Sequence, residues 1–220
     1  MKLVKWRMLT LLKPINIVAL LILFSFIYVY QSFVMTTLPA NEQTFAFALL
    51  HKLSAAYVML PMLSIVVAYF YNTSHRNAIV VTYRRVIWLD LILYSQLMTV
   101  ILLVMHIVAI LLTIGTFQLT YLDWIVIAMV WLSHSTVAFL TMLVFVITKR
   151  KYVAVLVINM AVLCDFLLLQ NDKGTLLLVD VQIMSSLSIM QVLLRIFGLL
   201  ILCAIIYSVT IDEEVVECLQ

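Results

Sequence analysis

The sequence predicts an all-α integral membrane protein with six transmembrane helices. Of the 220 residues, 66% are hydrophobic and only 10% are charged, whereas a soluble domain usually carries about 25% charged residues. A helix needs about 20 apolar residues to cross the hydrocarbon core of a bilayer, which is about 30 Å thick. Stretches of about this length fall at residues 15–35, 53–72, 91–114, 122–147, 152–169 and 190–211. We therefore expect one membrane domain, residues 1–220, in contact with lipid.

A short basic segment precedes the first apolar stretch. Residues 2–13, KLVKWRMLTLLK, combine cations with Trp6, a composition that favours the membrane interface. We expect residues 1–14 to form an amphipathic elbow that ends at Pro14, although simple anchoring of the topology explains the same charges. The uncharged run that follows is longer than the apolar region of a signal peptide and has no small-residue cleavage site behind it. It is therefore interpreted as a retained helix.

The positions of lysine and arginine predict that both ends of the sequence face the cytoplasm. Cytoplasmic loops of membrane proteins are enriched in these residues. With an inside N-terminus and six spans, the inside segments hold Lys2, Lys5, Arg7, Lys13, Arg76, Arg84, Arg85, Lys149, Arg150 and Lys151, and the outside loops hold Lys52 and Lys173.

The connections between the apolar stretches differ in length and polarity. Residues 115–123 are few, so the third and fourth stretches are expected to form a tight antiparallel hairpin. Residues 170–189 begin with a polar turn and then become apolar again, which is unusual for a free outer loop. Non-spanning backbone at membrane depth is tolerated where it is packed in protein. We predict a re-entrant or interfacial helix here.

Motifs for catalysis and nucleotide binding are absent from the sequence. It lacks a Gly-rich phosphate loop, Gly-x-Ser-x-Gly and His-Glu-x-x-His, and it has only three glycines. Its three cysteines, Cys164, Cys203 and Cys218, suggest neither a disulfide framework nor a metal cluster. We therefore expect no enzymatic activity, no cofactor in this chain and no nucleic-acid partner.

Two histidines are predicted within the membrane. His106 and His134 lie in the third and fourth apolar stretches, about 13 and 15 residues from the hairpin loop, so their depths differ by only about 3 Å. Three interpretations remain open. Each imidazole can hydrogen-bond a neighbouring helix, the pair can line a transport path, or the two can serve as axial ligands of a haem.

A carboxylate and a guanidinium form a second candidate pair. Asp165 and Arg195 lie in the fifth and sixth stretches, at similar heights towards the outer face. Isolated charges are costly in a membrane and are usually paired. We expect an ion pair, which serves either the structure or a gate and substrate contact.

The segment between the second and third stretches is basic and aromatic. It contains VVTYRRVIWLDLI, and residues 74–88 are long enough for two to three helical turns along the cytoplasmic face. Positive-inside anchoring explains the arginines, but an exposed apolar patch beside them usually marks a partner. Together with the basic elbow, the six spans and the apolar excursion before the last span, this segment resembles a permease subunit of the ABC-2 type. The short basic pair followed by Trp is similar to small bacterial permeases that export peptides or protect against them.

The resemblance implies a function and partners. The segment would be a coupling helix that docks on a separate cytoplasmic ATP-binding subunit, which binds the ATP and Mg²⁺. A second permease subunit would complete the path across the bacterial plasma membrane for amphipathic peptides or lipid-like molecules. Residues 149–151 would add a minor contact. The docking residues would be Arg76, Tyr83, Arg84, Arg85 and Trp88.

Two alternatives belong to other classes. One is a haem-binding redox protein that uses His106 and His134. The other is a membrane immunity or sensor protein that acts by sequestration and transports nothing.

Overall fold

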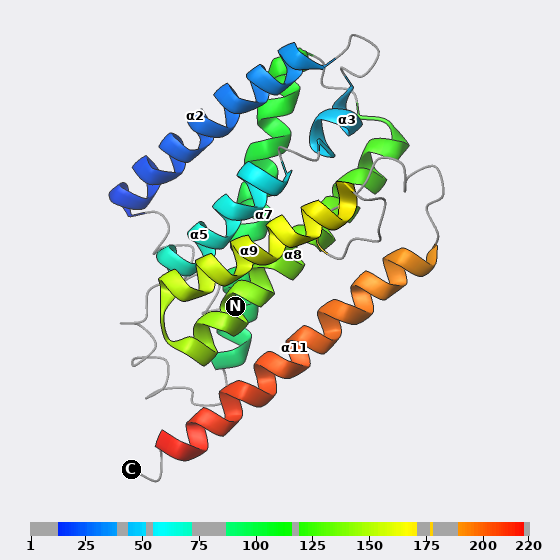
Figure 1. Ribbon diagram of the computed structural model, residues 1–220. Helices are drawn as coiled ribbons and strands as arrows, with labels where there is room; N and C mark the ends of the chain where they lie inside the picture. Colours follow the sequence, from blue (N-terminus) through cyan, green and yellow to red (C-terminus); the bar gives the residue numbers. More distant parts are fainter. Residues whose placement is uncertain are drawn as a thin grey trace.

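The computed structural model describes residues 13–38, 44–51, 55–71, 87–115, 119–170, 177 and 189–217. All regular structure in these ranges is helical, which confirms the all-α prediction for them (Figure 1). The elements are α2 (Pro14–Thr37), α3 (Phe45–Leu49), the π-helix η2 (Ala55–Met59), α5 (Leu60–Phe70), α7 (Ile87–Ile114), α8 (Tyr121–Thr148), α9 (Lys151–Gln170) and α11 (Ile189–Glu217).

Five helices are long and apolar enough to cross a membrane: α2, α7, α8, α9 and α11. They begin and end close to the predicted stretches, except that α7 starts one turn earlier and α11 continues to Glu217. The predicted second span corresponds to η2 and α5, which together run over residues 55–70 and are shorter than the other five. At about 1.5 Å per residue this helix is about 24 Å long, so the six-span topology stays a prediction.

Proline determines how this shorter helix is built. Pro61 lies in the first turn of α5, directly after the π-helical turn. Proline has no backbone N–H, and its ring crowds the carbonyl one turn before it. A widened π turn is one way for a helix to accommodate such a position. The apolar pattern alone predicts one uniform helix here, and this local change is not visible in it.

The connections on either side of α8 are short and have defined ends. After α7, Gly115 adopts a left-handed conformation with φ of 72°, which glycine reaches without steric cost. Thr120 then forms a capping box with Asp123 at the start of α8. At the other end, Lys149 is left-handed with φ of 58°, and α9 begins at Lys151. The helices α7, α8 and α9 therefore alternate in direction, as predicted for α7 and α8.

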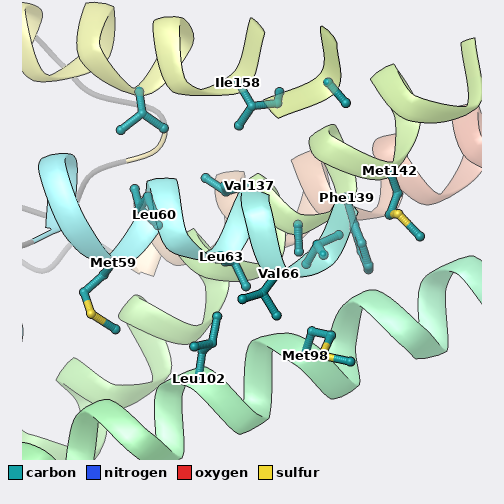
Figure 2. Close-up of a cluster of buried hydrophobic side chains, with 14 of the residues drawn as sticks. Met59, Leu60, Leu63, Val66, Met98, Leu102, Val137, Phe139, Met142 and Ile158 are labelled. Atoms are coloured by element: carbon teal, nitrogen blue, oxygen red, sulfur yellow. The ribbon is translucent and has the colours of Figure 1, made fainter. Parts of the chain in front are cut away.

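The core forms around α8, which packs against α5, α7, α9 and α11. Helix α2 packs mainly on α7, and α11 packs mainly on α8. Both helices lie at the periphery of the bundle (Figure 1). Side chains from η2, α5, α7, α8 and α9 interdigitate in the core (Figure 2). Its labelled members are Met59, Leu60, Leu63, Val66, Met98, Leu102, Val137, Phe139, Met142 and Ile158.

The two peripheral helices expose large apolar side chains along their length. On α2 these include Leu21, Ile22, Val29 and Phe33, and on α11 they include Leu193, Leu194, Phe197 and Leu200. Water would not tolerate such continuous apolar faces, whereas lipid tails solvate them. The composition, the helix lengths and these faces together indicate a multi-pass membrane protein.

Candidate functional site

Polar side chains gather near both ends of the bundle interior. At one end of the bundle α5 stops and α7 and α9 begin, and residues 72–86 connect α5 to α7 there. We call it the basic-segment end. We call the opposite end, where α7 stops and α8 begins, the hairpin end.

At the basic-segment end, hydrogen bonds tie three helices together. The Tyr71 hydroxyl lies 3.2 Å from a carboxylate oxygen of Asp90, in the first turn of α7. The Lys151 ammonium donates to the backbone carbonyls of Tyr71 and Tyr69, at 2.9 and 3.3 Å. Carbonyls at a helix C-terminus have no partner within the helix, so Lys151 satisfies two groups that would otherwise need water. We call Tyr71, Asp90 and Lys151 the polar clamp.

Aromatic packing reinforces the polar clamp. The Tyr71 ring meets the Tyr94 ring edge to face, with centroids 5.1 Å apart, and approaches Phe145 at 6.0 Å. The Tyr94 hydroxyl donates to the carbonyl of Val66, at 3.4 Å. Tyr71, directly before the connection 72–86, and Asp90, in the first turn after it, are therefore buried and fixed to the bundle.

Most of the predicted docking residues lie outside the described residues: Arg76, Tyr83, Arg84 and Arg85. Trp88 is described, and it belongs to the first turn of α7. Its half-buried ring packs edge to face on Tyr207 of α11, with centroids 5.4 Å apart. Contact between Trp88 and a partner stays a prediction, but the tryptophan also fastens α7 to α11, which its sequence position did not reveal.

Towards the hairpin end, the two histidines lie in the interior. His106 and His134 are 1% and 2% exposed, and they are close enough for charges on their imidazoles to repel each other. His106 Nε2 lies 3.3 Å from Gln31 Oε1 on α2, and His134 Nδ1 lies 2.9 Å from the carbonyl of Val130. The structure therefore buries both histidines and adds Gln31 as a partner of His106, which the sequence did not single out, while the direct pairing of the two histidines stays a prediction.

Several polar atoms of this region have no hydrogen-bond partner among the described residues. They are Gln31 Nε2, His106 Nδ1 and His134 Nε2. Most buried polar groups in proteins are satisfied by protein or by ordered water, so each of these atoms is a position where a water molecule would find a hydrogen-bond partner.

The charges of Asp165 and Arg195 attract each other, and the ion pair between them stays a prediction. The Asp165 carboxylate additionally accepts a hydrogen bond from the backbone N–H of Leu177, at 3.0 Å. The hydroxyl of Ser133 on α8 donates to the carbonyl of the same leucine. Leu177 is buried, so at this residue the predicted excursion does enter the bundle with its backbone satisfied. The rest of that excursion, and the predicted elbow up to residue 12, lie outside the described residues.

Sequence reasoning missed Gln31, Tyr71 and Asp90 as interior polar residues. Gln31 is the only amide in the middle of the first apolar stretch, since Asn16 lies at its start, and Asp90 is an acid at the edge of the third. Burying a polar side chain in a membrane costs free energy, so such residues usually face the bundle interior. That cost was the signal in the sequence that could have identified them. For metals, no cluster of three or more His, Cys, Asp or Glu side chains occurs within the ranges that the structure describes.

Comparison with known proteins finds no matching family model, no matching curated protein and no matching solved structure. Any functional conclusion therefore depends on the chain's own residues.

Proposed function

We propose that this chain is the membrane-embedded permease subunit of an ABC exporter of the ABC-2 type. A separate cytoplasmic subunit would hydrolyse ATP, and this chain would couple hydrolysis to the export of amphipathic peptides or lipid-like molecules. The proposal includes six spans with both ends of the sequence in the cytoplasm, a second permease subunit, and the bacterial plasma membrane as the location.

The polar clamp is the observation that supports coupling. A docking segment can move transmembrane helices only if its ends are firmly attached to them. Tyr71 precedes the basic segment and Asp90 follows it, and the two share a buried hydrogen bond. Lys151 attaches α9 to the same point. A displacement of residues 72–86 would therefore be passed to α5, α7 and α9 together, a rigid-body type of transition.

The interior supports a cargo with both apolar and polar parts. The core is mostly aliphatic and methionine-rich, and methionine adapts to different shapes. Polar groups at the hairpin end, among them His106, His134 and Asp165, would offer contacts for the polar part.

Affinity purification of the tagged chain in mild detergent, followed by mass spectrometry, tests the partnership. We expect a nucleotide-binding ATPase to co-purify in a stoichiometric amount. Recovery of the chain alone from the native membrane would contradict the proposal. If cells with the chain alone are still protected against a toxic peptide, the result would favour the sequestration alternative. A coloured preparation with a Soret band would favour the haem-binding alternative.

Charge reversal in the basic segment tests coupling directly. The double variant Arg84→Glu, Arg85→Glu should abolish stimulation of the partner ATPase, because it replaces two cations at the predicted dock. The double variant Lys2→Glu, Lys5→Glu carries the same charge change on the same predicted side and should retain stimulation. Membrane insertion of both variants is checked by alkaline extraction. Full stimulation by the first variant would refute the coupling role.

A further inference from the structure

Two side chains hold one residue of the connection between α9 and α11 inside the bundle. Leu177 is 6% exposed and belongs to the same buried hydrophobic cluster as Ile158 and Phe166 of α9. Its backbone N–H donates to Asp165 Oδ2 on α9, at 3.0 Å, and its carbonyl accepts the hydroxyl hydrogen of Ser133 on α8. We call Ser133 and Asp165, together with the space that Leu177 fills, the leucine site.

The two hydrogen bonds of the leucine site reproduce those of a paired β-strand. In an antiparallel sheet, a residue can exchange both its N–H and its C=O with one partner residue. Here two side chains from different helices replace that partner. The Asp165 carboxylate accepts the N–H, and the Ser133 hydroxyl donates to the C=O. Every residue of a peptide except proline carries the same two backbone groups, so the contacts do not require that the residue belongs to this chain.

The same contacts discriminate between classes of apolar ligand. The carbonyl of a lipid ester could accept a hydrogen bond from Ser133, but an ester has no N–H for Asp165. The carboxylate would then lose a donor in an apolar interior, which costs free energy. The buried space around Leu177 is hydrophobic, so it suits an aliphatic side chain better than a charged one. The leucine site therefore matches a hydrophobic residue of a peptide.

The position of the site suits a peptide that crosses the bundle. Asp165 lies five residues before the end of α9, towards the hairpin end, which is the predicted outer side. An extended peptide at membrane depth needs partners for its backbone groups. A hydrophobic residue that replaces Leu177 would form the same two hydrogen bonds and fill the same space, so the exchange leaves the number of hydrogen bonds unchanged.

We propose that the leucine site binds a hydrophobic residue of an extended peptide, and that Leu177 is its resident occupant, which a cargo peptide replaces. This inference rests on the proposed export function and narrows its cargo to peptides rather than lipid-like molecules. Main-chain hydrogen bonds supply affinity in such recognition, and a pocket for the side chain supplies specificity. Binding is measured on this chain alone, so a failure to bind peptide and a failure to recruit an ATPase are separate results.

A photoreactive leucine derivative tests the proposal on the full-length chain in detergent micelles. The probe is N-acetyl-photoleucine methylamide, whose diazirine side chain labels neighbouring residues on illumination, and mass spectrometry locates the labels. We expect saturable labelling of α8 and α9 near Ser133 and Asp165, displaced by unlabelled N-acetyl-leucine methylamide. The same competitor with a methyl group on the leucine nitrogen has no N–H for Asp165. It should displace the probe about tenfold less well, the equivalent of one hydrogen bond to a charged group.

Two results of this experiment would overturn the proposal. One is equal displacement by both competitors, because the N–H of the ligand would then make no contact. The other is labelling confined to lipid-facing residues such as Leu156 and Leu167 of α9, which are exposed. Either result would leave Leu177 as a purely structural contact.

Matched substitutions locate the site. Ser133→Ala removes the donor to the ligand carbonyl and should weaken probe binding about five- to tenfold. Ser135→Ala is the control, because the Ser135 hydroxyl donates to Gln96 instead, at 3.1 Å, and it should leave binding unchanged. An equal loss in both variants would contradict the assignment. If Ser133→Ala does not fold, the comparison of the two competitors on the unmodified chain still decides.

Removal of the resident side chain tests the exchange itself. Leu177→Gly vacates the hydrophobic space and ends the competition for it, so labelling at a low probe concentration should rise about fivefold or more. Unchanged or weaker labelling in this variant, with its circular dichroism unaltered, would show that the probe does not take the place of Leu177.

Discussion

The groups around Asp165 show how an ionisable side chain is accommodated inside this bundle. Its carboxylate accepts the N–H of Leu177 and lies near the positive charge of Arg195. The Ser133 hydroxyl completes the arrangement by donating to the Leu177 carbonyl. A buried charge is destabilising when one partner is removed, but replacing both partners with apolar residues is often tolerated.

Substitutions at this position should therefore be strongly non-additive. Asp165→Leu is expected to lower the free energy of unfolding by about 3–5 kcal/mol, because it strands the Arg195 charge. The double variant Asp165→Leu, Arg195→Leu should recover part of that loss, although the N–H of Leu177 remains without its acceptor. Chemical unfolding in micelles followed by circular dichroism measures both. Cys164→Ser, exposed on the same helix, should change little, and additive losses in the double variant would argue against the pairing.

His51 predicts a dependence of stability on pH. It is half-buried after α3, outside the long apolar helices, and burial lowers its pKa below the usual value of 6.5. Well above pH 6.5 the residue is neutral in both states, so its contribution is constant. As the pH falls below that value the unfolded chain takes up the proton first, and stability is lost.

The variant His51→Gln should remove this part of the pH dependence. We expect the variant to lose less stability than the unmodified protein when the pH is lowered from about 7.5 to about 5. These two values lie roughly one unit or more on either side of the usual histidine pKa. Thermal unfolding of both proteins at the two pH values measures the difference. An identical slope in the two proteins would show that His51 does not contribute.

At the level of elements, α5 depends on its neighbours at both ends. It starts from a π turn beside Pro61 and stops at Tyr71, where the polar clamp takes over the carbonyls that the helix leaves unpaired. A short helix in a bilayer gains much of its stability from such contacts, because the surrounding lipid is as apolar as its side chains. The clamp should therefore stabilise the end of α5 specifically.

Lys151→Met should loosen that end while leaving the rest of the bundle in place. The methionine keeps the apolar stem but loses the two hydrogen bonds to the Tyr69 and Tyr71 carbonyls. We expect amide hydrogen exchange over the last turn of α5 to accelerate by about tenfold or more, equivalent to at least one lost charged hydrogen bond. Lys13→Met, at the exposed start of α2, is the matched control. Unchanged exchange in Lys151→Met would show that the clamp is not needed for order.

At the scale of the whole molecule, the number of membrane crossings depends on whether the helix over residues 55–70 spans the bilayer. Its length of about 24 Å is less than the hydrocarbon thickness of about 30 Å. Bilayers can thin locally around a short span at a modest cost. The helix packs against α7, α8 and α9, so it lies in the interior of the bundle rather than on its surface.

We predict that this helix crosses the membrane, which gives six spans and places residues 1 and 220 on the same side. Reporter fusions at each terminus, active only in the cytoplasm, should both be active. A fusion inserted at residues 52–54 should be inactive, and one at residues 72–76 active. Opposite results at the two termini would establish an odd number of crossings and refute the six-span topology.

Composition and hydropathy were sufficient to predict the membrane class, the helical fold and the five long helices, with ends within about one turn except that α11 continues to Glu217. These properties are local, because a run of apolar residues of the right length forms a helix in lipid whatever its neighbours are. Matched depth in the sequence also predicts that His106 lies near His134 and Asp165 near Arg195, and both pairings stay predictions. Depth is simple to count along a helix, since each residue adds a fixed rise.

Only the tertiary structure decided which polar groups meet: Gln31 with His106, Tyr71 with Asp90, Lys151 with the end of α5, and Trp88 with Tyr207. Hydropathy does not distinguish one helix face from another when lipid and protein are equally apolar, as the peripheral faces of α2 and α11 illustrate. Helix partners in a membrane are selected by the shape of packed surfaces and by hydrogen bonds between helices. Both depend on the rotation of each helix about its axis, which the assembled bundle fixes.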